Sequence, residues 1–320
     1  EMIARLVGSE MCIRARLAAV QNTLADLVGA YALAVIDKNN PARIIAARNG
    51  SPLVLGLSDQ QHFIASDVHA LLKYTQQFIY LENGDVAEIS HDKIAIRDQS
   101  GQLIERQVKQ SMQSSEAAEK GNYAHFMLKE IYEQPRAISD TLEGRVVNGR
   151  VVDEILGPKA KSILDAIEAV QIIACGTSYH AGLVAKYWFE ELAGIHCHVE
   201  VASEFRYRKH VVRPGTLFVT VSQSGETADS LAALMQSKAE SYVGSLVICN
   251  VSESSLVRES DLALMTHAGP EIGVASTKAF STQLVALMLL VILVGRRKSL
   301  AADSERELVA QLLNLPARIN

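Results

Sequence analysis

Apolar runs alternate with amphipathic segments throughout the second half of the chain. The apolar runs cover residues 170–175, 198–202, 217–222, 245–251 and 261–266. Segments with helical spacing of their apolar residues lie between several of these runs, as at 179–192 and 228–238. Strands buried on both faces read as continuous apolar runs, and strands that alternate with helices form parallel sheets. The pattern predicts an α/β fold with a flavodoxin-like, doubly wound parallel sheet.

The first half of the chain has short apolar runs separated by tight turns. The predicted strands cover 31–37, 43–47, 53–57, 62–66, 78–81 and 86–89. Turn sequences separate them, such as Asn-Gly-Ser-Pro at 49–52 and Glu-Asn-Gly-Asp at 82–85. Short strands joined in this way predict an antiparallel layer, and a helix-like piece over residues 1–28 precedes it.

A polar segment, residues 106–122, joins the two halves, and we interpret it as a linker. A helix-like piece over 123–134 follows, which we expect Pro135 to end. The longest apolar stretch, 284–294, is shorter than the ~20 residues that a membrane-spanning helix needs, so we expect a buried helix. With no visible signal peptide, we expect a cytoplasmic protein without a membrane partner.

Composition and charge narrow the classes of function. With 48% hydrophobic and 21% charged residues the chain can form ordinary cores, which excludes a disordered tail. A net charge of −5 disfavours a nucleic-acid partner, which requires a basic surface. Four cysteines without a C-x-x-C pair indicate a reducing compartment. His196 and His198 share a strand face but no further ligands stand at a suitable spacing, so we expect neither a metal site nor a cofactor.

A turn rich in hydroxyl groups, Ser-Gln-Ser-Gly-Glu-Thr at 222–227, carries the strongest chemical signal. It follows an apolar run and precedes a helical segment, so backbone N–H groups at the helix start can bind an anion. Ser222, Ser224 and Thr227 add donors, and Gly225 lets the backbone approach a ligand closely. The turn has no lysine, which excludes the loop that binds nucleoside triphosphates. It predicts a site for one phosphate on a small molecule; the alternative is a helix cap that binds nothing.

Two more turns of this kind occur in the second half. Cys-Gly-Thr-Ser at 175–178 follows one apolar run, and Val-Ala-Ser-Thr-Lys at 274–278 begins the long apolar helix. In an open parallel sheet, ligands bind beyond the carboxyl ends of the strands, where successive turns meet. We therefore expect the hydroxyl-bearing turns to share one pocket.

The motifs at 175–178, 202–207, 222–227 and 271–278 resemble the sugar isomerase (SIS) domain. Together with the segment Phe-Met-Leu-Lys-Glu-Ile-Tyr-Glu-Gln-Pro at 126–135, they make the chain similar to the glutamine–fructose-6-phosphate aminotransferase family. That family joins an N-terminal-nucleophile glutaminase domain to two SIS domains, and transfers ammonia from glutamine to fructose 6-phosphate to give glucosamine 6-phosphate. The resemblance implies four parts: the C-terminal part of an α+β glutamine amidotransferase type 2 domain (1–105), a linker (106–150), the first SIS domain (151–300), and the start of a connection to a second one (301–320).

The resemblance also implies site residues. Residues that grip the sugar phosphate are Ser178, Ser222, Gln223, Ser224 and Thr227, and residues that line the sugar are Thr177, Val274, Ala275 and Ser276. Glu226 would repel phosphate unless it points away, so we leave it out of the site. We expect Lys278 to be structural or a surface charge. The ligands are then fructose 6-phosphate and glucosamine 6-phosphate, with glutamine bound only by the complete enzyme, and the SIS domain implies a homodimer.

The chain departs from the family at both ends. The N-terminal nucleophilic cysteine is absent, Cys12 has no free α-amine with which to replace it, and residues 7–14 do not match the family. The family's ring-opening histidine, enolising glutamate and Schiff-base lysine belong to a second SIS domain beyond Asn320. We therefore expect a fragment that binds the sugar phosphate and is inactive alone, without catalytic residues of its own. The alternatives are a sugar-phosphate sensor, which the β-rich front end and acidic charge disfavour, and a related SIS deglycase or aminotransferase that acts on another sugar.

Overall fold

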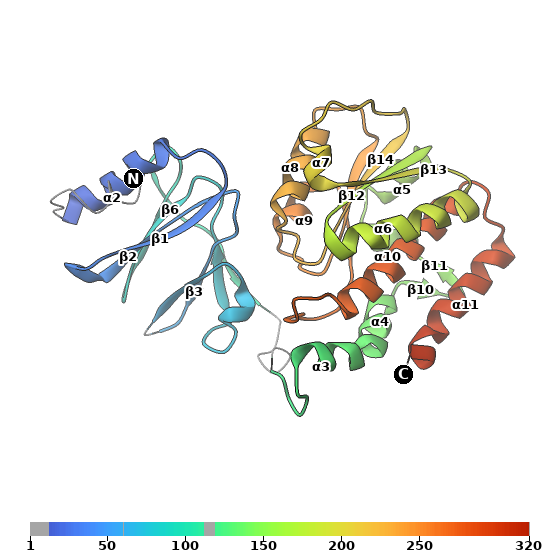
Figure 1. Cartoon of the computed structure of the whole chain (residues 1–320), viewed down its shortest axis with the longest axis horizontal. Coiled ribbons are helices and arrows are strands. Elements are labelled where there is room, and N and C mark those ends of the chain that lie inside the picture. The colour runs from blue at the N-terminus through green and yellow to red at the C-terminus, as the bar shows by residue number, and fades with distance from the viewer. Residues whose placement is uncertain (1–12, 60, 112–118, 320) are drawn as a thin grey trace. The chain divides into compact units, whose positions relative to one another are not determined.

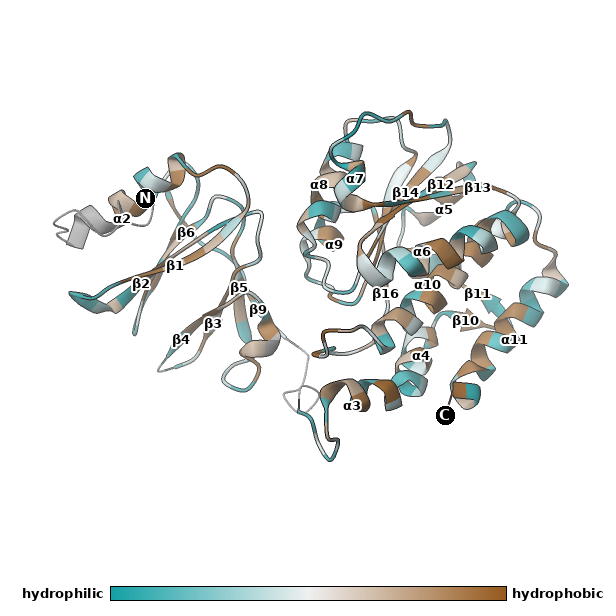
Figure 2. Cartoon of the chain, viewed as in Figure 1, coloured by the Kyte–Doolittle hydropathy of each residue, from teal (hydrophilic) through white to brown (hydrophobic). Residues whose placement is uncertain are grey.

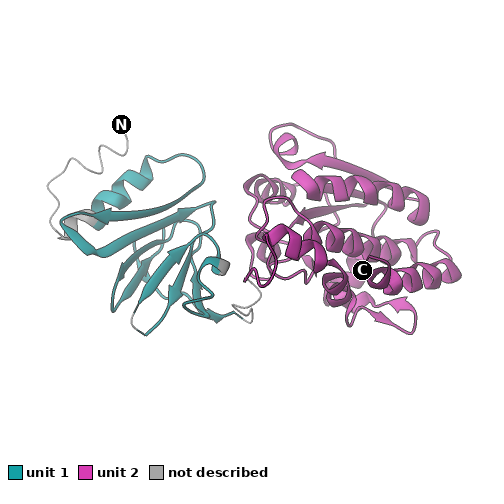
Figure 3. Cartoon of the chain, turned by 60° about the horizontal axis from the view of Figure 1, so that its bottom comes forward, with its two compact units in different colours: residues 1–118 teal, residues 119–320 magenta. Residues whose placement is uncertain are grey.

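The chain divides into two compact units, residues 1–118 and 119–320 (Figure 3). A computed structural model describes residues 13–59, 61–111 and 119–319. Cys12 and most of the stretch 7–14, on which the sequence departs from the family, lie outside the described residues. Each unit has its own hydrophobic core, and each is described by itself.

Unit 1 is built from two antiparallel sheets with the strand orders β1-β2-β6-β7-β8 and β4-β3-β5-β9. The elements are α2 (Ile13–Ala25), β1 (Tyr31–Asp37), β2 (Asn40–Asn49), β3 (Val54–Leu57), β4 (His62–Ala65), η1 (Val68–Ala70), β5 (Gln77–Tyr80), β6 (Val86–Ser90), β7 (Ile94–Arg97), β8 (Leu103–Ile104) and β9 (Val108–Gln110). Ala46 and Ala87 from one sheet pack with Leu55 and Ile79 from the other. The predicted antiparallel strands are confirmed, but they form two layers instead of one.

Unit 2 contains a parallel sheet, of which β12, β13 and β14 are labelled in Figure 1. Its strand order, β13-β12-β14-β15-β16, is that of flavodoxin-like folds. The strands are β12 (Ala169–Ala174), β13 (His196–Val201), β14 (Thr216–Ser222), β15 (Gly244–Cys249) and β16 (Leu262–Met265). All neighbouring pairs are parallel. The predicted doubly wound α/β fold is therefore confirmed for this unit.

Helices cover both faces of this sheet. Around it lie α3 (Phe126–Tyr132), α4 (Gln134–Leu142), β10 (Val146–Val147), β11 (Arg150–Val151), η3 (Asp153–Leu156), α5 (Ala160–Asp165), α6 (Gly176–Trp188), η4 (Phe189–Ala193), α7 (Ala202–Phe205), α8 (Ala228–Ser237), α9 (Ser255–Glu259), α10 (Lys278–Gly295) and α11 (Ala302–Ile319). One core cluster joins the sheet to α4, α5, α6, α10 and α11, and a second joins the other face to α7, α8 and α9. Burial on both faces explains why the strands are apolar throughout.

The segment 106–150, which the resemblance implies to be a linker, contains regular elements in its described parts, 106–111 and 119–150. Its first part contributes β9, which pairs with β5 in unit 1, and its last part forms α3 and α4 in unit 2. We expected Pro135 to end a helix, but it stands in the first turn of α4. Proline is tolerated at this position because the N–H group that it lacks has no partner in the first turn.

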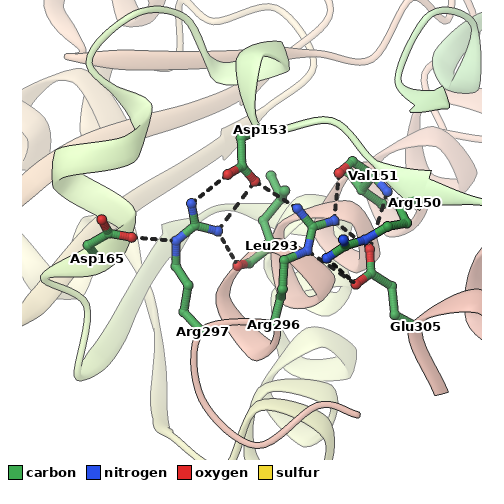
Figure 4. Close-up of polar contacts among 8 residues, drawn as sticks. All are labelled: Arg150, Val151, Asp153, Asp165, Leu293, Arg296, Arg297 and Glu305. Carbon is green, nitrogen blue, oxygen red and sulfur yellow. Dashed lines mark hydrogen bonds and ion pairs between the residues drawn. The ribbon is translucent and has the colours of Figure 1, made fainter. Parts of the chain in front are cut away.

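Helix α10 is the apolar helix that the sequence predicts, extended by several residues at its start. Its mean hydropathy is 2.0, and by length and composition it could cross a membrane, yet 78% of it is buried within the unit, as in a core helix (Figure 2). Just beyond its end, Arg296 and Arg297 form ion pairs with Asp153 at 2.9 and 2.7 Å, while Arg297 also pairs with Asp165 and Arg296 with Glu305 (Figure 4). This network joins the end of the core helix to η3, α5 and α11.

Candidate functional site

The turn after β14 is closed by its own hydroxyl groups. Ser222, the last residue of the strand, is 4% exposed, and its Oγ accepts a hydrogen bond from the amide of Gly225 at 3.0 Å. The same Oγ lies 3.1 Å from Oγ1 of Thr227, the N-cap residue of α8. Oγ of Ser224 accepts a hydrogen bond from the amide of Glu226 at 3.2 Å. The hydroxyl groups of the turn are thus gathered at the start of a helix.

The carboxylate of Glu226 is turned towards another helix. Its two oxygens accept hydrogen bonds from the amide and the hydroxyl group of Ser255, both at 2.8 Å. Ser255 is the first residue of α9, where backbone amides lack partners inside the helix. The carboxylate therefore caps α9. It points away from the hydroxyl groups of the turn, so it would not repel a phosphate bound there.

The turn after β12 lies beside the turn after β14, because the two strands are paired. Ala174 pairs with Val221, so the residues that follow them leave the sheet side by side. Gly176 begins α6 with φ of +55°, a conformation that favours glycine. Thr177 is exposed, and Ser178 is 7% exposed. The start of α6 thus presents one open and one buried hydroxyl group next to the turn at 222–227.

The strand order reverses between β12 and β14. From β12 the chain proceeds to β13 on one side, and then returns to β14 on the other side of β12. The hydroxyl turns that follow β12 and β14 therefore flank the switch point of the sheet, which is where open α/β sheets bind ligands.

The third predicted segment, 274–276, belongs to an irregular loop that precedes α10. Glu271 holds this loop from inside, accepting hydrogen bonds from the hydroxyl of Ser276 and the amides of Thr277 and Ala279 at 2.9, 2.9 and 3.1 Å. Val274 and Ala275 are exposed. Of the side chains predicted to line a sugar, those of Val274 and Ala275 are therefore accessible, while Ser276 is partly buried. The loop also bonds to Glu130 on α3 and, near its start, to the side chain of Asn250.

Comparison with known proteins agrees with these motifs. Residues 163–293 match the SIS domain family. Glutamine–fructose-6-phosphate aminotransferase [isomerizing] of Vibrio vulnificus is 53% identical over 322 residues, which cover 100% of this chain and 53% of that protein. The enzyme of the same name from Pseudomonas putida is 57% identical over 302 residues, covering 94% of this chain and 49% of that protein. Unit 2 contains a SIS domain.

Over its whole length the chain is homologous to these aminotransferases, and it spans about half the length of the curated relatives that it matches. Among solved structures, the C-terminal domain of glucosamine-fructose-6-phosphate aminotransferase from Francisella tularensis superposes with a TM-score of 0.61 at 52% identity, covering 62% of this chain and 56% of that one. A putative phosphosugar isomerase from Silicibacter pomeroyi gives 0.50 at 28% identity, covering 61% and 55%.

Two cavities in the described residues are lined by residues other than the predicted ones. One of about 430 Å³ lies in unit 1, beside α2 and β1. The other, of about 240 Å³, lies in the SIS domain and is lined by the first residues of β12, β13 and β14, including Gln171, His198 and Thr216. It therefore opens at the amino ends of the strands, whereas the hydroxyl turns follow the carboxyl ends. The candidate site is formed by turns at the edge of the sheet and not by either cavity.

The described residues contain no group of three or more histidine, cysteine or acidic side chains that could hold a metal ion. His198 lies 3.6 Å from Glu200, and hydrogen bonding to Arg208 lowers the pKa of the Glu200 carboxyl. Burial raises the pKa of the Cys197 thiol to about 12 and also raises that of Cys249. These thiols are packing groups of the SIS domain, because a nucleophilic or ligating cysteine needs a lowered pKa.

Sequence reasoning missed the residues that hold the third segment in place. Lys278 is 3% exposed and forms an ion pair with Glu133 of the α3–α4 junction at 2.6 Å, so it is a structural residue and not a surface charge. Glu130 on α3 is also buried and binds the loop before α10. Both glutamates stand in the segment 126–135 that supported the resemblance, but nothing in their local pattern indicates a partner so far along the chain.

Proposed function

We propose that this chain is the part of a glutamine–fructose-6-phosphate aminotransferase that holds the sugar phosphate. The observation that carries the proposal is the pair of hydroxyl turns, 175–178 and 222–227, on either side of the switch point between β12 and β14. The homology over the whole chain supports the same substrate. In the complete enzyme the reaction would convert fructose 6-phosphate and glutamine to glucosamine 6-phosphate and glutamate.

The turns suit a phosphate monoester for physical reasons. Hydroxyl groups and helix-start amides are neutral donors, and the dipoles of α6 and α8 favour negative charge at the same place. Phosphate would accept hydrogen bonds from Ser222, Ser224 and Thr227 in one turn and from Ser178 in the other, while Gln223 supplies an amide at the edge. No lysine or arginine is needed, because Glu226 directs its charge to α9.

The sugar would lie along Thr177 and the loop segment Val274, Ala275 and Ser276, of which the first two are exposed. We assign no catalytic residue to this chain, because the named site residues supply hydrogen-bond donors and packing surface. Its part in the reaction would be to fix the phosphate, and thereby to place the carbon chain of the sugar for chemistry performed by the rest of the enzyme.

The remaining assignments follow from the same proposal. Residues 1–105 would be the C-terminal part of the glutaminase domain, 106–150 the connection, 151–300 the first SIS domain, and 301–320 the start of the path to a second one. The antiparallel sheets of unit 1 support the first assignment. A cytoplasmic homodimer without a nucleic-acid or membrane partner would fit a biosynthetic enzyme of this kind.

Isothermal titration of the 320-residue chain tests the proposal, with fructose 6-phosphate, fructose and inorganic phosphate as separate ligands. We expect fructose 6-phosphate to bind more tightly than either partial ligand, and the double variant Ser222→Ala/Ser224→Ala to lose at least about tenfold in affinity, the equivalent of one hydrogen bond to a charged group. Ser139→Ala/Ser162→Ala is the matched control, because these hydroxyl groups only donate to backbone carbonyls of exposed helical turns. Unchanged binding in the first variant would overturn the assignment.

A further inference from the structure

Helix α3 holds the loop before α10 through one buried carboxylate. Glu130 is 2% exposed, and its Oε1 accepts hydrogen bonds from the amides of Ile272 and Gly273 at 2.6 and 3.0 Å. The two bonds join residues 142 and 143 positions apart in the chain. Two backbone amides bonded to one buried side-chain oxygen lose these bonds if the loop moves, so this contact fixes the backbone directly before Val274.

The contact depends on glycine at position 273. A Cβ atom there would lie 2.6 Å from Oε2 of Glu130 and 3.5 Å from Cα of Met127, which is closer to Oε2 than real Cβ atoms come. Among the residues that the structure describes, Oε2 itself is buried and has no hydrogen-bond partner. The carboxylate is thus enclosed between α3 and the loop. A shift of the loop would displace the carboxylate, and a shift of the carboxylate would displace the loop.

Further contacts anchor the other end of the loop to the same part of the chain. Lys278 pairs with Glu133 at 2.6 Å, and the hydroxyl of Ser281 donates to Oε1 of Gln134 at 2.5 Å. Glu271 binds the loop from within, as described above. Residues 274–276 therefore lie between two anchored ends, with Val274 and Ala275 exposed, and Glu130 is the anchor nearest to Val274.

We propose that Glu130 is a positioning residue that sets how well the site distinguishes a sugar phosphate from phosphate alone. The proposal rests on the proposed function, because it takes 274–276 as the segment that lines the sugar. Glu130 does not reach the hydroxyl turns that would hold the phosphate; its hydrogen bonds run to the loop. Loss of its carboxylate therefore removes contacts with the carbon chain of the ligand and leaves the phosphate contacts intact.

The first test compares dissociation constants for fructose 6-phosphate and inorganic phosphate in the whole chain. We expect Glu130→Ala to weaken fructose 6-phosphate about tenfold and to leave phosphate within about twofold. Glu130→Gln retains an acceptor for both amides, so it restores the ratio of the two constants to within about threefold of the wild type. If Glu130→Ala changes both constants equally, or neither, the positioning role is refuted.

Glu305→Gln is the matched control. Glu305 is also 2% exposed, but it pairs with Arg296 in the network beyond α10 and not with the loop. We expect this variant to lower thermal stability without changing the ratio of the two constants. A change in the ratio equal to that of Glu130→Ala would show that loss of any buried carboxylate has this effect, and would overturn the proposal.

Gly273→Ala approaches the same contact from the loop, and keeps the proposal testable if Glu130→Ala fails to fold. We expect it to change the ratio in the same direction, since the new Cβ displaces the carboxylate.

Hydrogen exchange separates this proposal from the proposed function. The amides of Ile272 and Gly273 should be protected in the wild type and in Glu130→Gln but not in Glu130→Ala, even if fructose 6-phosphate does not bind at all. Persistent protection in Glu130→Ala would refute the positioning role whatever the ligand.

Discussion

Glu226 and Ser255 join the hydroxyl turn 222–227, after β14, to the start of α9 through two hydrogen bonds of 2.8 Å. The pair resolves a conflict in the sequence, where an acidic residue stands inside a turn that otherwise suits an anion. The carboxylate accepts hydrogen bonds at the start of α9 and so stabilises that helix. It does not occupy the hydroxyl donors on the other side of the turn.

Glu226→Gln and Glu226→Ala should therefore separate structure from binding. We expect the glutamine variant to bind fructose 6-phosphate within about twofold of the wild type, because the removed charge faces α9. The alanine variant should lose about 1–3 kcal/mol in free energy of unfolding, because buried donors on Ser255 lose their acceptor. Chemical denaturation and calorimetric titration measure the two effects. A gain of tenfold or more in affinity for the glutamine variant would show that the carboxylate faces the ligand instead.

The two glycines of the hydroxyl turns should respond differently to alanine. Gly225 has φ of +68°, and a Cβ there would collide with the side chain of Ser254 and lie 2.7 Å from Sγ of Cys249. Gly176 has φ of +55°, but a Cβ there would meet no atom of the described, non-neighbouring residues within 4 Å. We expect Gly225→Ala to cost more than about 2 kcal/mol of stability and Gly176→Ala only about 1 kcal/mol, the strain of a left-handed residue. Urea unfolding curves measure both, and equal losses would contradict the packing described around Gly225.

Thiol reactivity should follow burial. Cys197 has a pKa of about 12, so at pH 8 only about one thiol in 10⁴ is a thiolate, and Cys249 is also shifted upwards by burial. Cys175, at the start of α6, is only half-buried. We expect iodoacetamide to label Cys175 in the native protein and to leave the other two until urea unfolds it, as peptide-resolved mass spectrometry would show. Equally fast native labelling of Cys197 would contradict its placement in the core.

The ion-pair network beyond α10 should make stability depend on pH. Hydrogen bonding to Arg297 lowers the pKa of Asp153 below its unfolded value of about 3.9, so the stabilisation is present above that pH and is lost as pH falls through the folded pKa. Because Asp153 is about one-third exposed, we expect Asp153→Asn to cost only about 1 kcal/mol at pH 7. The difference from the wild type should shrink as pH falls through the folded pKa of Asp153 and vanish well below it.

Asp140→Asn is the control for that measurement. It removes an exposed pair with Arg136 on one helix, whose loss should cost less than about 0.5 kcal/mol at pH 7. Urea unfolding at several pH values compares the two variants. A loss in Asp153→Asn that is as large at pH 2.5 as at pH 7 would show that the carboxylate acts through packing instead of charge.

Local pattern was sufficient to predict much of the fold. The apolar runs of the SIS domain predicted its strands to within about two residues, as with β14, predicted at 217–222 and found at Thr216–Ser222. The missed strands, β7 to β11, are only two to four residues long, so they have little periodicity to detect. Pro135 was misjudged because proline both ends helices and begins them, and only the tertiary structure decides which.

Residues of the candidate site could be predicted where they stand close together in the sequence. Ser222, Ser224 and Thr227 stand within one turn, and strand pairing brings Ser178 to the neighbouring turn. The anchors Glu130 and Glu133 were not predictable, because their partners are about 145 residues away and a buried glutamate has the same local pattern as an exposed one. Whether a buried charged group finds a partner far along the chain depends on the folded structure, and no short stretch of sequence shows it.

The place of α10 in the chain bears on how the protein is synthesised. A helix of this hydropathy would attract chaperones or a membrane if it emerged from the ribosome with nothing to cover it. Here every strand of the parallel sheet, together with α4 and α6, precedes α10 in the sequence, so most of the surface that buries it has already been translated. The order of elements along the chain thus shortens the time during which its most apolar helix is exposed.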